Sequence, residues 1–135
     1  MPKAPGVQVP PACDLTLGMV CVKKDVPGET VWTMTVDERF CNPVGVMQGG
    51  FLAAFVDSAM GASSITAAQG RKIFSANAEL KISFFRPVPM NSLITCTATA
   101  VSSGSRVNFV EADVHGEDGK LLARATSTYM IRDRT

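Results

Sequence analysis

The stretch 48–68 constrains the fold of this chain more than any other segment. It is rich in Ala, Leu, Phe and Met and contains no Pro, and at about 20 residues it is long for a strand and suited to a helix. Apolar residues fall on nearly all sides of that helix, which is typical of a buried helix rather than a surface one. We therefore expect the rest of the chain to form a layer that covers it.

Six other segments carry the residue types of β-strands. The segment 73–85 is the clearest, because apolar and polar residues alternate along its whole length. Phe74, Leu80 and Phe84 share one face, against which we expect the helix to pack, and Asn77 falls on the polar face. The expected strands are 18–24, 29–36, 73–85, 92–102, 106–115 and 121–132, and 37–47 is expected to be a loop.

The order of these elements is two strands, one helix and four strands joined by short turns. This order predicts an α+β fold in which a six-stranded antiparallel sheet wraps around one long buried helix. Residues 1–12 hold four of the eight prolines. We therefore expect residues 1–14 to form an irregular N-terminal tail and residues 15–135 to form a single domain.

Composition excludes several classes of protein. The chain has 13 basic and 12 acidic residues, so it lacks the basic footprint of a nucleic-acid-binding protein. Its four cysteines form no CxxC pair and it has one His, which argues against a metal site. The start MPKAPGVQVPPAC has no apolar run typical of a signal peptide, and no stretch is suited to cross a membrane. We expect a cytoplasmic protein with reduced thiols.

Two features break the local rules of a buried helix. The first is Gln48-Gly49-Gly50 at its start, since each glycine in a helix costs up to about 1 kcal/mol. Glycines leave the first N–H groups uncovered at the positive end of the helix dipole, and such groups suit a developing oxyanion. The alternative interpretation is that the glycines let the helix end pack tightly against a strand.

The second feature is Asp57, a carboxylate within the apolar run FLAAFVDSAMGA. Burying a carboxylate without a partner is costly, so its presence needs a reason. A carboxylate in apolar surroundings suits a general base. Alternatively, Asp57 is a structural residue that a neighbouring hydroxyl such as Ser58 satisfies.

The spacing of Gly49 and Asp57 predicts how a site could form. Eight residues correspond to roughly 12 Å along a helix, whereas a base and an oxyanion donor must both lie within about 3 Å of one reacting centre. Two antiparallel copies of the helix, related by a two-fold axis, could bring the two groups together. The charged residues are only 19% of the chain, which agrees with a dimer interface that covers apolar surface.

The stretch NPVGVMQGGFLAAFVDSAMGAS, followed by NAELKISFFRPV, resembles the hotdog-fold acyl-CoA thioesterases, most closely the phenylacetic-acid-degradation type. That family reads roughly N-P-x-G-x-x-H-G-G-x-x-x-x-x-x-D-x-A-x-G, followed by T-x-x-L-x-I-x-F-x-R-P. The resemblance covers most of the expected domain. It implies a hotdog fold, a homodimer as the minimum active unit, commonly paired into a homotetramer, and an acyl-CoA substrate. It implies no metal and no cofactor beyond the CoA moiety of the substrate.

The resemblance also implies roles for individual residues. Asn42 corresponds to a loop Asn that helps to place water or thioester, Gly49 to the glycine whose N–H polarises the thioester carbonyl, and Asp57 to the general base or nucleophile. Gln48 replaces the family's His, and Asn77 replaces its usual Thr or Ser. Gln can donate a hydrogen bond to a thioester oxygen, but it cannot titrate.

Asn77 and four further residues are candidates for substrate binding. Gly50 adjoins the oxyanion glycine. Arg86 and Arg106 could meet the phosphates of CoA, although solvated charges at strand ends are the alternative. Met47 could line an acyl pocket or simply pack in the core.

We therefore expect an acyl-CoA thioesterase that hydrolyses an aryl- or short/medium-chain acyl-CoA to the free acid and CoA. The alternative is a catalytically impaired acyl-CoA-binding protein of the same fold, with a regulatory or ligand-binding role, because the family's His is replaced. A hydratase or dehydratase would need a catalytic His near an acid, and His115 lies far along the chain on a predicted strand. An unrelated β-rich carrier would lack the long helix.

Overall fold

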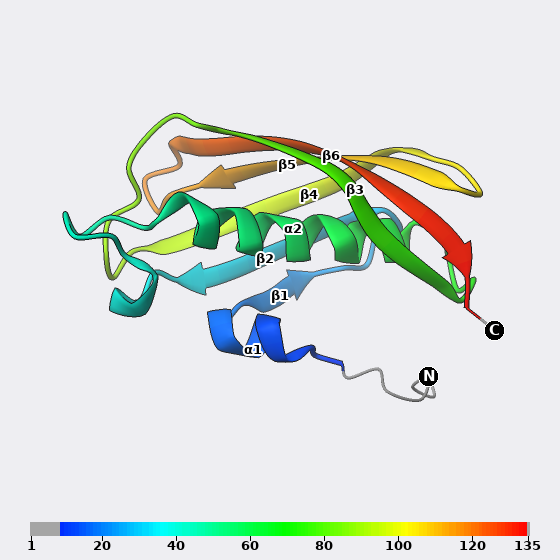
Figure 1. The fold of residues 1–135 in the computed structure, drawn as a ribbon, viewed down its shortest axis with the longest axis horizontal. Coiled ribbons are helices and arrows are strands. Elements are labelled where there is room, and N and C mark those ends of the chain that lie inside the picture. Colours follow the sequence, from blue (N-terminus) through cyan, green and yellow to red (C-terminus); the bar gives the residue numbers. More distant parts are fainter. Residues whose placement is uncertain (1–8, 135) are drawn as a thin grey trace.

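A computed structural model describes residues 9–134. These residues form one antiparallel sheet in the order β1-β2-β4-β5-β6-β3, and the long helix α2 lies along one face of it (Figure 1). This arrangement confirms the predicted six-stranded sheet around one long helix. The elements are α1 (Ala12–Leu17), β1 (Val20–Lys23), β2 (Glu29–Thr35), the 3-10 helix η1 (Glu38–Phe40), α2 (Gly49–Thr66), β3 (Ile73–Phe84), β4 (Leu93–Ser103), β5 (Val107–His115) and β6 (Leu121–Asp133).

The core lies between α2 and the inner face of the sheet. Several inner sheet positions opposite the helix are small, and this lets the helix approach the strands closely. Each large apolar side chain buried there contributes about 1.5–3 kcal/mol relative to the exposed state. The buried core includes Met34, Ile94, Cys96, Ala98, Val110, Ala112, Ala123 and Ala125 from the sheet and Leu52, Phe55, Val56, Ala59 and Met60 from α2.

Buried hydroxyl groups fix the position of α2 on the sheet. Thr30 on β2 lies 2.7 Å from the Ser63 hydroxyl on α2, and it donates to the carbonyl of Ala59 at 3.1 Å. Ser63 in turn donates to the carbonyl of Ala98 on β4 at 2.9 Å. Because unpaired buried polar groups are costly, these bonds favour a single placement of the helix along the strands.

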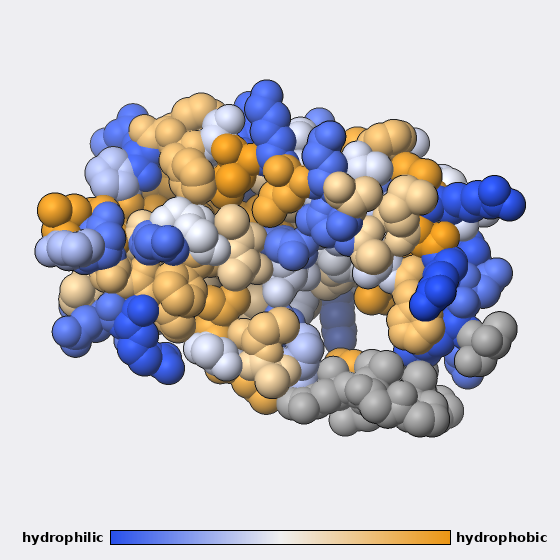
Figure 2. Space-filling model, in the orientation of Figure 1, coloured by the Kyte–Doolittle hydropathy of each residue, from blue (hydrophilic) through white to orange (hydrophobic). Residues whose placement is uncertain are grey.

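The sheet covers only one side of α2. On the other side, Phe51 and Ile65 are 38% and 50% exposed, and Ala54 between them is also exposed. Figure 2 shows apolar residues gathered on the left part of this face, where the first half of α2 lies. Apolar residues on the sheet-facing side of α2 therefore pack in the core, and apolar residues on its opposite side form an exposed apolar surface.

A β-bulge in β3 changes which residues of that strand face the helix. The register of β3 against β6 shifts between Asn77 and Glu79, so the alternation is interrupted at Ala78. Leu80 packs against the core, as expected. Phe74 was expected on the same face, but it is 42% exposed and lies under the guanidinium of Arg132 on the opposite face. The expectation for Phe74 was wrong because strict alternation cannot reveal an inserted residue.

The same bulge corrects the placement of Asn77. Before the bulge, Ser75 and Asn77 face the helix: Ser75 hydrogen bonds to Ser64, and Asn77 to Asp57. Asn77 therefore does not lie on a solvent-facing polar side of the strand, as its alternation pattern indicated. The bulge allows polar residues in the first half of β3 and apolar residues in the second half to face the same helix.

The start of the chain also differs from expectation. Helix α1 begins at Ala12, within the segment 1–14 that we expected to be irregular, and it ends at Gly18, which adopts the left-handed conformation. Residues 1–8 lie outside the described part. The other element boundaries agree with the predicted ones within two residues. No helix within residues 9–134 is both long and apolar enough to cross a membrane.

Candidate active site

Asp57 lies in the middle of α2, partly exposed, and its carboxylate accepts two side-chain hydrogen bonds on one oxygen. Asn77 Nδ2 on β3 donates to Oδ1 at 2.8 Å, and the Tyr129 hydroxyl on β6 donates to the same atom at 2.6 Å. No donor to Oδ2 occurs among the described residues. Asp57 is therefore not satisfied by Ser58, which was the structural alternative, but by two residues from distant strands.

The orientation of the Asn77 amide follows from its neighbours. The backbone N–H of Glu79 donates to Asn77 Oδ1 at 2.9 Å, and the Ser127 hydroxyl lies 2.9 Å from the same oxygen. Because a backbone N–H can only donate, the carbonyl oxygen of the amide must face it, and Nδ2 must face Asp57. The bulge supplies that N–H, so the backbone irregularity of β3 is part of the site.

Tyr129 completes this network and was missed by the sequence analysis. Its side chain is 2% exposed, and burial, with a further contribution from the hydrogen bond to Asp57, raises its pKa above the ordinary range of a phenol. Ser127 and Tyr129 lie on the inward face of β6, where the neighbouring Ala123 and Ala125 are apolar. Polar groups at inward positions of a predicted strand were the signal that could have revealed them.

The start of α2 forms the second part of the candidate site. Gln48 is the N-cap residue, and its Oε1 accepts from the Phe51 N–H at 3.2 Å. The N–H groups of Gly49 and Gly50 have no acceptor among the described residues, as expected for the first turn of a helix. The ring of Phe84 lies against Gly49, where a Cβ atom would meet it at 3.1 Å. Close packing against β3 is thus confirmed at Gly49, and the uncovered N–H groups are the donors on which the functional interpretation depends.

The loop before α2 brings Asn42 to the same end of the helix. Asn42 Oδ1 accepts from the N–H groups of Val44 and Val46 at 3.1 and 3.3 Å, which holds the loop in a tight turn. The loop returns to α2 through an isolated bridge between Cys41 and Met47. Met47 is 7% exposed and packs in the core.

The two parts of the candidate site do not meet within one chain. Gly49 and Asp57 lie on one continuous helix, roughly 12 Å apart along its axis and about 80° apart around it. The two arginines are also separated. Arg86 follows β3 near the start of α2, whereas Arg106 lies in the β4–β5 connection beside Ile131, near the other end of the helix.

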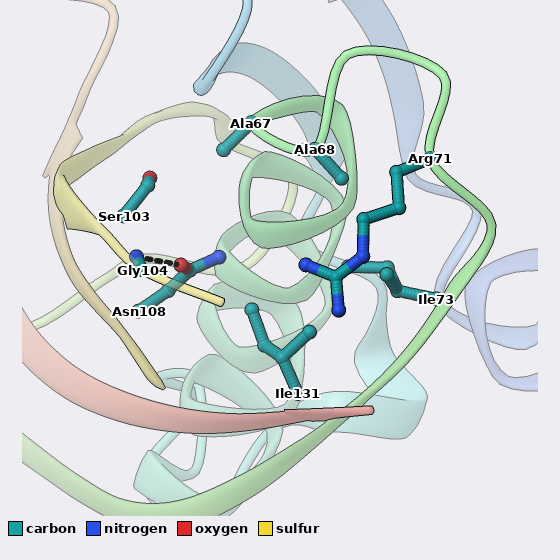
Figure 3. A pocket seen from close by; sticks show the side chains of 8 residues that line it. All are labelled: Ala67, Ala68, Arg71, Ile73, Ser103, Gly104, Asn108 and Ile131. Atoms are coloured by element: carbon teal, nitrogen blue, oxygen red, sulfur yellow. Dashed lines mark hydrogen bonds between the residues drawn. The ribbon is translucent and has the colours of Figure 1, made fainter. Parts of the chain in front are cut away.

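Two cavities lie away from Asp57. One, of about 20 Å³, lies beside the end of α2 between Arg71, Asn108 and Ile131 and has room for about one water molecule (Figure 3). The other is an open cleft of about 400 Å³ on the outer sheet face, lined by residues that include His115 and Arg124. The structure does not bring His115 to Asp57, because His115 lies in this outer cleft with Glu111 and Asp113.

Other sequence-based expectations can be compared with the described residues. All four cysteines are free, as expected. Burial, with a smaller contribution from the charge of Asp113, raises the pKa of Cys96 to about 12. No group of three or more His, Cys, Asp or Glu side chains that could hold a metal ion occurs within residues 9–134.

Comparisons with known proteins identify the family. A model described as the thioesterase superfamily matches residues 44–123, which include the start of α2, Asp57 and Asn77. Acyl-coenzyme A thioesterase 13 of Homo sapiens is 25% identical over 83% of this chain and 79% of its own length. The solved structure of a phenylacetic acid degradation-related protein from Ralstonia eutropha JMP134 is 33% identical, covers 89% of both chains and has a TM-score of 0.81.

The fold agrees with a further solved structure. The PaaI protein from the E. coli phenylacetic acid degradation operon superposes with a TM-score of 0.85 over 93% of this chain and 87% of its own, at 22% identity. This likeness extends over the sheet and the helix that carry Asp57, Asn77 and Tyr129. Since the family model matches more than half of the sequence, and since the motif and the fold agree with it, the chain belongs to the thioesterase superfamily.

Proposed function

We propose that this protein hydrolyses acyl-CoA thioesters to the free acid and CoA. The observation that carries the proposal is a partly exposed carboxylate, the one charged side chain of α2, held by Asn77 and Tyr129 in a chain of the thioesterase superfamily. The similarity to acyl-coenzyme A thioesterase 13 supports CoA thioesters as the substrate class. We propose an aryl or a short- to medium-chain acyl group, because the exposed apolar residues near the start of α2 include Phe51, Phe84 and Phe85.

In the proposed reaction, Asp57 acts as a general base on a water molecule. The water oxygen bonds to the thioester carbonyl carbon while its proton passes to Asp57. The carbonyl oxygen becomes negative and is stabilised by the N–H of Gly49 at the start of a helix. The carbon–sulfur bond then breaks, and the proton on Asp57 passes to the thiolate of CoA. In an alternative route Asp57 attacks the carbonyl carbon itself, and the carbon–sulfur bond breaks to release the CoA thiolate. Water then hydrolyses the resulting mixed anhydride, which gives the acid and restores the Asp57 carboxylate, and the released proton passes to the thiolate.

The proposed active unit is a homodimer, with two such dimers forming a tetramer. Asp57 and Gly49 on one helix are too far apart to reach one carbonyl, so Asp57 of one subunit would face Gly49 of the partner subunit. The twelve-residue β3 supports this arrangement, because it is an edge of the sheet and has exposed apolar residues such as Phe74 and Ala76. Long exposed apolar edges are normally covered.

Gln48 and Asn42 are proposed to orient the reactants. Because Gln48 Oε1 is used in capping α2, its Nε2 is left to donate to an acyl or thioester oxygen. Asn42 likewise uses its oxygen to hold the loop, which leaves its Nδ2 for water or thioester. Neither role needs a titrating side chain. Gly50, Met47, Arg86 and Arg106 stay candidates for substrate binding.

The first experiment is a thiol-release assay over a panel of aryl and linear acyl-CoA substrates. Asp57→Asn should lower kcat by at least about a hundredfold, because it removes the base but keeps the side-chain shape. Ser58→Ala, one residue along the same helix, is the matched control and should leave kcat within about twofold. Full activity in a folded Asp57→Asn protein would refute the role of Asp57.

The same assay tests the alternative of a binding protein without catalysis. The observation that favours this alternative is Gln48, which cannot carry a proton where the family has His. Calorimetric binding of acyl-CoA without any thiol release by the wild-type protein would support the alternative over hydrolysis. Gain of activity in Gln48→His would indicate a decayed enzyme.

A complementation experiment tests the shared site. Gly49→Pro removes the N–H at the first helical position, which proline favours in helices, although here the Phe84 ring must move aside, and Asp57→Asn removes the base. Each variant alone should be inactive. A mixture of equal amounts, unfolded and refolded together, should recover about one quarter of wild-type activity, because half of the dimers are mixed and each holds one intact site. No recovery, despite mixed dimers, would contradict a site between subunits.

A further inference from the structure

We propose that Tyr129 is a positioning residue that holds the carboxylate of Asp57 by Oδ1 and leaves Oδ2 as the atom that acts on water or substrate. This inference rests on the proposed function. The inference goes beyond the proposed function in two ways. It assigns different roles to the two oxygens of Asp57, and it gives a role to Tyr129, which lies outside the motif of the family.

The geometry supports different roles for the two oxygens. Oδ1 accepts from Asn77 on β3 and from Tyr129 on β6, whereas no described residue donates to Oδ2. Rotation of the carboxylate about its terminal torsion would break both bonds at once. Hydrogen bonds to a charged group are stronger than those between neutral groups, so this orientation is held firmly.

The Tyr129 side chain has few alternatives to this contact. Its hydroxyl lies 2.6 Å from Asp57 Oδ1 and 2.9 Å from the backbone carbonyl of the same residue, so both acceptors belong to Asp57. The ring is buried beside Gly61, one turn further along α2, where a Cβ atom would be in ordinary contact with it at 3.7 Å. Tyr129 therefore joins β6 to the one turn of α2 that carries the carboxylate.

Tyr129 acts as a donor throughout the pH range in which the enzyme would work. Burial and the neighbouring Asp57 hold its pKa above the ordinary range, so the phenol keeps its proton. The polar groups beside it are Asn77 and Asn108 on the two adjacent strands, β3 and β5, and Ser127 on its own strand, and none of these titrates. Asp57 is thus its one charged neighbour among the described residues.

Tyr129→Phe tests this role because it removes only the hydroxyl. The expected result is a loss in kcat of about ten- to hundredfold with KM changed less than about twofold. A folded Tyr129→Phe protein with wild-type kcat and KM would overturn the proposal.

A second measurement does not depend on activity or on the stability of that variant. Tyr129 is the only tyrosine of the chain, so growth on 3-fluorotyrosine labels this position alone. The fluorine resonance should shift during an acid titration in wild type and in Asp113→Asn, a carboxylate paired with Arg124 on the outer face of the sheet. It should not shift in the same way in Asp57→Asn.

The thiol-release assay and the fluorine titration distinguish a failure of the proposed function from a failure of the positioning role. A wild-type protein that releases no thiol from any acyl-CoA would refute the proposed function, and the fluorine titration would still decide whether Tyr129 and Asp57 are coupled. An active wild type whose fluorine resonance behaves alike with and without the Asp57 carboxylate would refute the positioning role and leave the proposed function standing.

Discussion

Gln48 is the N-cap of α2, and Gly50 lies in its first turn. Substitutions of these two residues should have non-additive effects on the free energy of unfolding. Gln48 Oε1 accepts from the Phe51 N–H at 3.2 Å, and a Cβ atom on Gly50 would lie 2.8 Å from that oxygen. Gly50→Ala therefore displaces the cap, which costs about 1 kcal/mol. The higher helix propensity of Ala stabilises the helix by up to about 1 kcal/mol relative to Gly, which offsets this loss. The free energy of unfolding should change by less than about 0.5 kcal/mol.

The result should differ when the cap is already absent. Gln48→Ala alone should lower the free energy of unfolding by about 1 kcal/mol. In that background, Gly50→Ala displaces nothing and should raise the free energy by up to about 1 kcal/mol. The measurement is urea unfolding of the four proteins, followed by circular dichroism at one protein concentration, because association would add to stability. Additivity within about 0.3 kcal/mol would refute the inferred contact between the two residues.

Two further predictions concern the core and the bulge. A thiol reagent at about pH 8 should modify the exposed Cys13 quickly and Cys96 only after unfolding, because Cys96 is fully buried and its pKa is raised to about 12. Rapid modification of Cys96 in the native protein, detected by mass spectrometry, would contradict this prediction. Deletion of Ala78 should remove the bulge and leave a regular pairing with β6 in which Asn77 and Leu80 both still face α2, so the free energy of unfolding should fall by less than about 1 kcal/mol in urea titrations; a loss of about 2 kcal/mol or more would be inconsistent with that register.

The expected elements follow closely from local patterns in the sequence. A long proline-free apolar stretch can be predicted as the buried helix 48–68 because no other regular structure buries such a run in a small domain. Gly49 and Asp57 stand out for a related reason, since glycine and a carboxylate are both unfavourable in a buried helix. Residues that contradict their local surroundings can be recognised without coordinates.

The partners of Asp57 could not be derived in this way. Asn77 lies in a strand whose alternation places it on the outer face, and only the inserted residue at Ala78 turns it inward. A single inserted residue leaves no clear mark in the sequence, because the apolar residues on both sides of it keep their spacing. Tyr129 lies 72 residues from Asp57 along the chain, so no local pattern could indicate their contact.

The elements, their order, and the presence of two unusual groups on one helix can be predicted from the chain alone, because these depend on the chemistry of neighbouring residues. Three other features become visible only in the folded domain: which oxygen of Asp57 is held, which strands hold it, and that Gln48 serves as a cap. Those features depend on strand pairing and on a bulge, which join segments far apart in the chain and are governed by the packing of the whole domain.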